Sequence, residues 1–64
     1  MTNLKEVKSH FSKDGIQSIT NEIANYQFVK RDENTFFQFS NGEYKRYRTF
    51  EGFCKAVLYR IKRG

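Results

Sequence analysis

The residues with the most chemistry to offer lie together in the segment Tyr44-Lys45-Arg46-Tyr47-Arg48. An arginine presents a planar group of several N–H donors that engages phosphates or base edges, and a tyrosine ring stacks on an unpaired base. This combination predicts a contact with nucleic acid. The candidate nucleic-acid-binding residues come from this segment and from a second basic cluster near the C-terminus: Tyr44, Lys45, Arg46, Arg48, Arg60, Lys62 and Arg63.

The residue sets that catalysis or metal binding would need are missing from the sequence. The single histidine, His10, and the single cysteine, Cys54, cannot close a tetrahedral zinc site or an internal disulfide. The four glycines are dispersed and form no phosphate-cradling loop. Of the seven carboxylates, Asp32 and Glu33 fall in a predicted turn, and neither has a neighbour that would tune it for acid–base work. We therefore expect no catalytic residue, no metal and no cofactor, and we expect that the protein is not an enzyme.

A predicted β-hairpin over residues 35–48 positions the candidate residues. Two β-prone, aromatic-rich runs flank the pair Asn41-Gly42, and both of these residues tolerate the positive φ of a tight hairpin turn. The period of two then puts Tyr44, Arg46 and Arg48 on one face of their strand.

The register of this hairpin stays open at the level of sequence. A two-residue loop sets Phe39 opposite Tyr44 and Phe37 opposite Arg46, whereas a three-residue loop sets Phe39 opposite Glu43. Under the two-residue register, one alternative is that Tyr44 packs into the core beside the two phenylalanines while the arginines lie along the sheet edge. The other is that Tyr44 and the arginines form an exposed recognition face.

The charge of the chain is unevenly distributed. The net charge is +5; residues 1–34 hold five basic and five acidic side chains, whereas residues 35–64 hold seven basic and two acidic ones. Such asymmetry indicates a polyanionic partner, either nucleic acid (DNA or RNA) or an acidic protein surface. No apolar run approaches the roughly 20 residues of a membrane-spanning helix, and residues 1–10 lack the apolar core of a signal peptide. We expect a cytoplasmic protein without membrane contact.

The N-terminal half predicts a helix followed by a less certain segment. Asn3 and Glu6 form a capping-box pattern before a helix that ends ahead of Gly15. The isoleucine spacing over residues 16–26 favours a second short helix, although Ser18 and Thr20 leave an extended alternative open. A strand is expected over residues 26–31, with a polar turn at residues 32–34.

The C-terminal part predicts the clearest helix. Thr49 is a good N-cap, and basic residues gather near the C-terminal end, where they complement the helix dipole. The apolar residues follow spacings of three and four: Phe50, Phe53, Cys54, Val57, Leu58 and Ile61. The expected fold is a single α+β domain over residues 1–64. It has an N-terminal helical segment, a three-stranded antiparallel sheet and a C-terminal amphipathic helix packed on one sheet face.

The order of three strands followed by an amphipathic helix, over about residues 26–63, resembles the DNA-binding arm domains of tyrosine recombinases and the plant AP2-type domains. The resemblance implies that strand residues such as Arg46 and Arg48 enter the major groove of DNA. The chain lacks the tryptophans and the Thr-Lys-Glu-Ala-like helix start that are common in those families, so the resemblance concerns the arrangement of elements.

An alternative function is a small inhibitor or adaptor that binds another protein. An exposed Phe36 or Tyr47, flanked by Arg46 and Arg48, would then form the centre of the contact, since aromatic and arginine side chains are enriched at such centres. The Lys-, Asn-, Ile- and Phe-rich composition is similar to that of small proteins encoded by phages and mobile elements. The oligomeric state is open, because an uncovered sheet edge can pair with a second copy.

Overall fold

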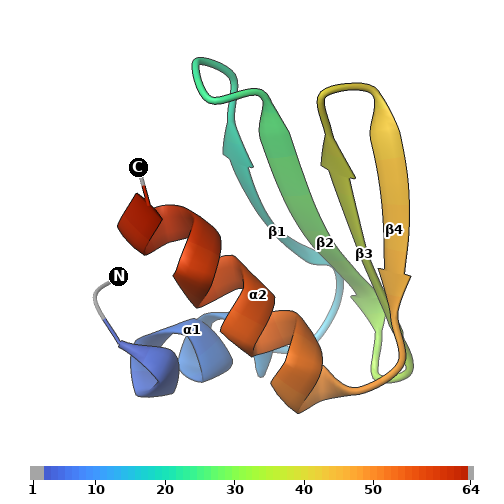
Figure 1. The fold of residues 1–64 in the computed structure, drawn as a ribbon. Helices are drawn as coiled ribbons and strands as arrows, with labels where there is room; N and C mark the ends of the chain where they lie inside the picture. Colours follow the sequence, from blue (N-terminus) through green and yellow to red (C-terminus); the bar gives the residue numbers. More distant parts are fainter. Residues whose placement is uncertain (1–2, 64) are drawn as a thin grey trace.

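The computed structural model describes residues 3–63, which form two helices and one antiparallel sheet (Figure 1). The elements in chain order are α1 Leu4–Phe11, β1 Gln17–Asn21, β2 Tyr26–Asp32, β3 Thr35–Ser40, β4 Glu43–Tyr47 and α2 Phe50–Arg63. Each strand pairs with the next, so the order across the sheet is β1-β2-β3-β4. Both helices lie against one face of this sheet (Figure 1). The α+β class is confirmed, but the prediction of three strands is wrong because the sheet has four.

The additional strand is β1, which forms where a short helix was predicted for residues 16–26. Ile19 of β1 is paired with Phe28 of β2, and half-buried residues alternate with exposed ones along the strand. Two isoleucines of the expected helical stripe contribute nothing to the core, since Ile16 is exposed and Ile23 is fully so. The pleated surface suits β-branched Ile19 and Thr20, and pairing with β2 outweighs the weak helix propensity of this segment.

Asparagines shape the turns at one end of the sheet. The β3–β4 loop consists of Asn41 and Gly42 with φ of 50° and 80°, the positive values that a two-residue hairpin turn requires. Asn25, with φ of 58°, ends the β1–β2 turn, and its side-chain Nδ2 donates to Asn41 Oδ1 at 3.1 Å. The two-residue register is thereby confirmed, with Phe39 opposite Tyr44, and the three-residue alternative is wrong.

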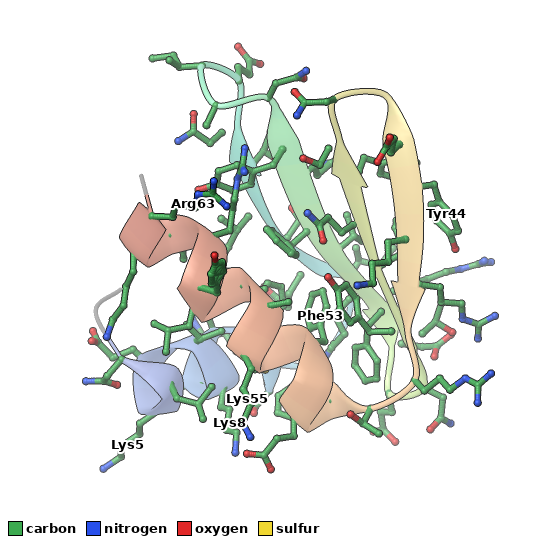
Figure 2. All side chains as sticks on the ribbon, viewed as in Figure 1. Lys5, Lys8, Tyr44, Phe53, Lys55 and Arg63 are labelled. Atoms are coloured by element: carbon green, nitrogen blue, oxygen red, sulfur yellow. The ribbon has the colours of Figure 1, made fainter. Side chains whose placement is uncertain are left out.

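The core lies between the helices and the sheet, and Phe53 of α2 is at its centre (Figure 2). Its ring centroid is 4.8 Å from that of Phe11, 5.3 Å from Phe36, 5.8 Å from Tyr47 and 6.0 Å from Phe28. Three of these pairs are edge-to-face and the pair of Phe36 with Phe53 is stacked, and both arrangements add stabilisation beyond the burial of apolar area. The predicted apolar stripe of α2 therefore faces the core, with its Leu58 and Ile61 half-buried at the margin.

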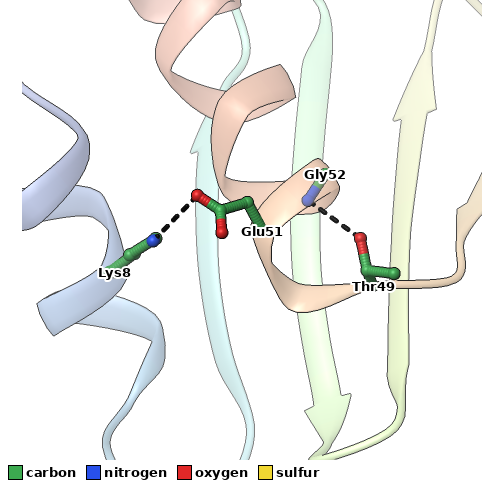
Figure 3. A network of polar contacts seen from close by, with 4 residues as sticks. All are labelled: Lys8, Thr49, Glu51 and Gly52. Atoms are coloured by element: carbon green, nitrogen blue, oxygen red, sulfur yellow. Dashed lines mark hydrogen bonds and ion pairs between the residues drawn. The ribbon is translucent and has the colours of Figure 1, made fainter.

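Local polar contacts set the starts of both helices. Thr49 Oγ1 accepts from the Gly52 amide at 3.0 Å (Figure 3). Asn3 Oδ1 accepts from the Glu6 amide at 2.9 Å, so both predicted N-caps are confirmed. An ion pair of 3.0 Å between Lys8 and Glu51 joins α1 to α2 (Figure 3). Within residues 3–63, neither helix is long and apolar enough to cross a membrane.

Candidate nucleic-acid interface

The sheet face turned away from the helices carries the candidate site, and we call it the outer face (Figure 1). The strand pairing and the alternation of buried and less buried residues assign two residues of each strand to it. These are Ser18, Thr20, Gln27, Val29, Phe37, Phe39, Tyr44 and Arg46. In the part of the chain that the structure describes, no helix covers this face, so its residues contact solvent.

Three aromatic rings form a cluster on the outer face. The ring centroid of Tyr44 lies 5.3 Å from that of Phe39 and 5.8 Å from that of Phe37, and the two phenylalanine rings are 5.5 Å apart. Tyr44 points away from the helices (Figure 2) and is 57% exposed, and Phe39 is 44% exposed. The alternative that placed Tyr44 in the core is therefore wrong. The three residues do meet, but on the uncovered side of the sheet.

Arg46 lies next to this cluster, opposite Phe37 in the strand pairing. Its guanidinium is exposed and makes no hydrogen bond or ion pair with any residue of the described range 3–63. Arg48, also exposed, directly follows β4, and both arginines border a hollow of about 520 Å³ that Asn34 and Tyr47 complete at the sheet edge. Two guanidiniums, which suit carboxylate and phosphate groups, thus line the same hollow.

No carboxylate interrupts the outer face between the strand ends, since none of its eight residues is acidic. Glu43, the one acidic residue of β4, is paired with Ser40 on the side that faces the helices. Asp32 lies at the far end of β2, beside the bulge at Arg31, and its pKa is lowered chiefly by a hydrogen bond from the Asn34 amide. The middle of the face is thus apolar and aromatic, with positive charge at one edge.

Lys45 belongs to the other side of β4. It is paired with Gln38, and its Nζ lies 5.1 Å from the centroid of the Tyr47 ring. Tyr47 in turn donates its hydroxyl to Gln38 Oε1 at 2.7 Å, and burial raises the pKa of this hydroxyl. Tyr47 is half-buried and Phe36 is buried. The two aromatic residues considered as an exposed protein contact therefore contribute to the core instead.

The basic cluster of α2 is separate from the outer face. Arg60 donates from Nη2 to the Ala24 carbonyl at 3.0 Å, and its guanidinium lies 5.2 Å from the centroid of the Tyr26 ring. It therefore fastens α2 to the β1–β2 turn. Lys62 and Arg63 are exposed at the end of the helix, and Figure 2 shows Arg63 on the opposite side of the molecule from Tyr44. The structure brings together Tyr44, Arg46 and Arg48, and leaves Lys45, Arg60, Lys62 and Arg63 elsewhere.

Sequence reasoning missed the outward orientation of Phe37 and Phe39 as site residues. The signal was present in the alternation of the segment Thr35-Phe36-Phe37-Gln38-Phe39, where Phe36 is the one phenylalanine on the side that faces the core. It also missed Thr20, which reaches the outer face because β1 is a strand, and Gln27 of β2, which is paired with Thr20. Cys54 is buried, and burial raises the pKa of its thiol to about 11, so it is a core residue. No group of three potential metal ligands occurs within residues 3–63.

Comparison with models of protein families, with curated proteins and with solved structures finds no match to this chain. Its function is therefore inferred from the residues of the outer face and their geometry. Exposed rings can stack on planar groups, and free guanidiniums beside them can hold anionic oxygens. A ligand that suits both properties combines flat apolar rings with a regular negative charge.

Proposed function

We propose that the protein is a small nucleic-acid-binding module whose outer face contacts the ligand. One observation carries the proposal: the exposed cluster of Phe37, Phe39 and Tyr44 adjoins the unpaired guanidinium of Arg46 on a face without acidic strand residues. Nucleic acid offers phosphates for the arginines and base surfaces for the rings. The net charge of +5 favours the approach of any polyanion.

Arg46 and Arg48 contact phosphate in this proposal, and Tyr44 contacts a base or sugar. Because each neutralised phosphate releases counterions, affinity falls steeply as salt rises. The remaining basic candidates have smaller roles. Arg60 is already engaged with Ala24, and Lys62 and Arg63 lie too far around the molecule to share a contact with the outer face. These three residues contribute only to the overall electrostatic attraction between the protein and a polyanion.

Salt dependence of binding tests the proposal. Fluorescence anisotropy of labelled oligonucleotides over a range of salt gives the slope of log affinity against log salt. Arg46→Ala is expected to weaken binding and to reduce the slope by about 0.7 to 0.9, the contribution of one phosphate contact. Arg63→Ala is the matched control, because it removes the same charge from the far side and should leave the slope nearly unchanged. Absence of binding by the parent protein at low salt would refute the proposal.

A second candidate function is binding of a protein with an acidic surface, as an inhibitor or adaptor. The exposure of Phe39 and Tyr44 beside an arginine favours it, since aromatic and arginine side chains dominate protein contacts. The same titration separates the two functions. A contact centred on rings depends weakly on salt, whereas a contact with several phosphates depends strongly on it.

A further inference from the structure

The chemistry of the outer face also distinguishes between paired and unpaired nucleic acid. In a duplex the base surfaces are stacked on one another, and a protein reaches only the base edges and the backbone. Two of the three clustered rings, Phe39 and Tyr44, are about half exposed on β3 and the edge strand β4, close to the Asn41-Gly42 turn. Phosphates and sugars of a duplex offer these rings no flat surface on which to stack, whereas each ring can stack on a base that has no partner.

The orientation of the rings indicates separate platforms. The planes of Phe39 and Tyr44 are inclined at 51° to each other, and those of Phe37 and Phe39 at 80°. One flat base therefore cannot stack on all three rings at once. Because Phe39 and Tyr44 are the two most exposed members of the cluster, they are the rings available to successive bases of a flexible strand.

A hollow beside Phe39 supplies polar groups that recognise a base edge. It has a volume of about 210 Å³, below the roughly 300–1,000 Å³ of pockets for drug-sized ligands, and suits a smaller planar group. Its lining includes Thr20, Gln27 and Asn41, and Glu22 of the β1–β2 turn adds one acidic side chain. In the strand pairing Gln27 lies directly between Thr20 and Phe39.

The amides at this hollow have donors and acceptors to spare. Gln27 makes no side-chain hydrogen bond with any residue of the described range 3–63. Asn41 accepts at Oδ1 from Asn25 and keeps its own Nδ2 free within that range. An amide pairs in a bidentate way with the edge of a base, most favourably with adenine. A base that stacks on Phe39 brings its edge toward Gln27.

We infer that the outer face binds single-stranded nucleic acid, with one unpaired base stacked on Phe39 and its edge bonded to Gln27, and a neighbouring base stacked on Tyr44. This inference rests on the proposed function and names its substrate class. The resemblance to arm and AP2-type domains implies the opposite preference, since strands that enter a major groove require a duplex. The inference therefore predicts tighter binding of a single strand, whereas the resemblance predicts tighter binding of a duplex.

The test compares labelled oligonucleotides of about 12 nucleotides, single-stranded and as the matched duplex, at one moderate salt concentration. The single strand is expected to bind at least about 10-fold more tightly. Tyr44→Ala and Phe39→Ala should each weaken single-strand binding by about 5- to 150-fold, the range for one lost base stack. Their effect on the salt slope should be small, because neither residue carries a charge.

Two control variants make the result specific. Tyr59 is 60% exposed on α2, so Tyr59→Ala removes a ring of matched type and exposure from the other side and should leave affinity unchanged. Gln27→Ala should reduce the difference in affinity between adenine and pyrimidine homopolymers, while the salt slope stays as in the parent. Circular dichroism of each variant should match the parent, because these side chains lie on the surface.

The outcomes separate this inference from the proposed function. Equal binding of single strand and duplex, with an intact salt slope and loss on Arg46→Ala, would overturn the single-strand inference and leave nucleic-acid binding in place. The single-strand inference would also be overturned if Tyr44→Ala and Tyr59→Ala weakened single-strand binding equally. Absence of binding to either ligand at low salt would overturn both, and binding of an acidic protein with only weak salt dependence would then support the second candidate.

Discussion

Removal of the Phe53 ring should take away most of the stability of this fold. Phe53 is fully buried and its ring contacts four other aromatic rings, two of them on β2 and β3 and one on each of α1 and β4. Truncation of a buried phenylalanine to alanine costs about 3–5 kcal/mol. A chain of 64 residues has a free energy of unfolding of only about 3–10 kcal/mol in total. Phe53→Ala is therefore expected to be largely unfolded or close to it.

A graded series makes the Phe53 prediction quantitative. Phe53→Leu keeps most of the apolar volume and loses the ring contacts, so we expect a loss of about 1–3 kcal/mol with the fold retained. Leu58→Ala should cost less than the roughly 2–5 kcal/mol of a fully buried leucine, because Leu58 is half-buried. Exposed Tyr59→Ala is the control and should change stability little.

Urea denaturation and thermal melting, followed by circular dichroism, measure these losses. In a domain of this size each kcal/mol lowers the Tm by about 4–8 °C. Among the variants, Tyr59→Ala should have the highest Tm and Phe53→Ala the lowest, with Leu58→Ala and Phe53→Leu between them. A Phe53→Ala protein that melts within a degree or two of the parent would show that the core is not centred on this ring.

Two further predictions concern the backbone and the buried thiol. Gly42 has φ of 80° and open space around its Cα, so Gly42→Ala should destabilise the fold by about 1–2 kcal/mol through the backbone alone. Gly42→Asn should cost less, because asparagine tolerates positive φ. If both variants melted at the Tm of the parent, the positive φ at this turn would be contradicted. The Cys54 pKa is raised from 9.0 to about 11, so the folded state favours the neutral thiol. The stability that the neutral thiol contributes is fully present below pH 9 and is lost as the pH rises toward 11. In urea unfolding at several pH values, Cys54→Ala should not show this loss. If the free energy of unfolding had the same pH dependence in the parent and in Cys54→Ala, this prediction would be contradicted.

The elements that sequence predicted correctly are those with local causes. Asn3 and Thr49 begin their helices through bonds to amides three residues later, and Asn41 with Gly42 supplies the positive φ of the hairpin turn. Such interactions depend on neighbours in the chain, so residue type and spacing are sufficient to predict them.

The strand β1 was missed because its cause is not local. The spacing of its isoleucines matches a helical stripe, but the decisive contact joins Ile19 to Phe28, and this pairing is made by a different segment of the chain. Tertiary pairing of this kind overrides weak intrinsic propensity.

The candidate site was predicted in part for the same reason. The period of two correctly placed Tyr44 with Arg46, since that depends only on β4. Whether Phe37 and Phe39 face the core or solvent depends on which side of the sheet the helices cover. Arg60 is bound to a carbonyl 36 residues away in sequence, which no local pattern indicates.

The most direct measurement of the central claim is a map of backbone amide shifts by nuclear magnetic resonance during titration with a single-stranded oligonucleotide. The account predicts that the largest shifts occur at Phe37, Phe39, Tyr44 and Arg46 on the outer face, while the end of α2 around residue 62 changes little. Shifts confined to α1 and α2, or no shift at any ligand concentration, would contradict the claim that the outer face binds nucleic acid.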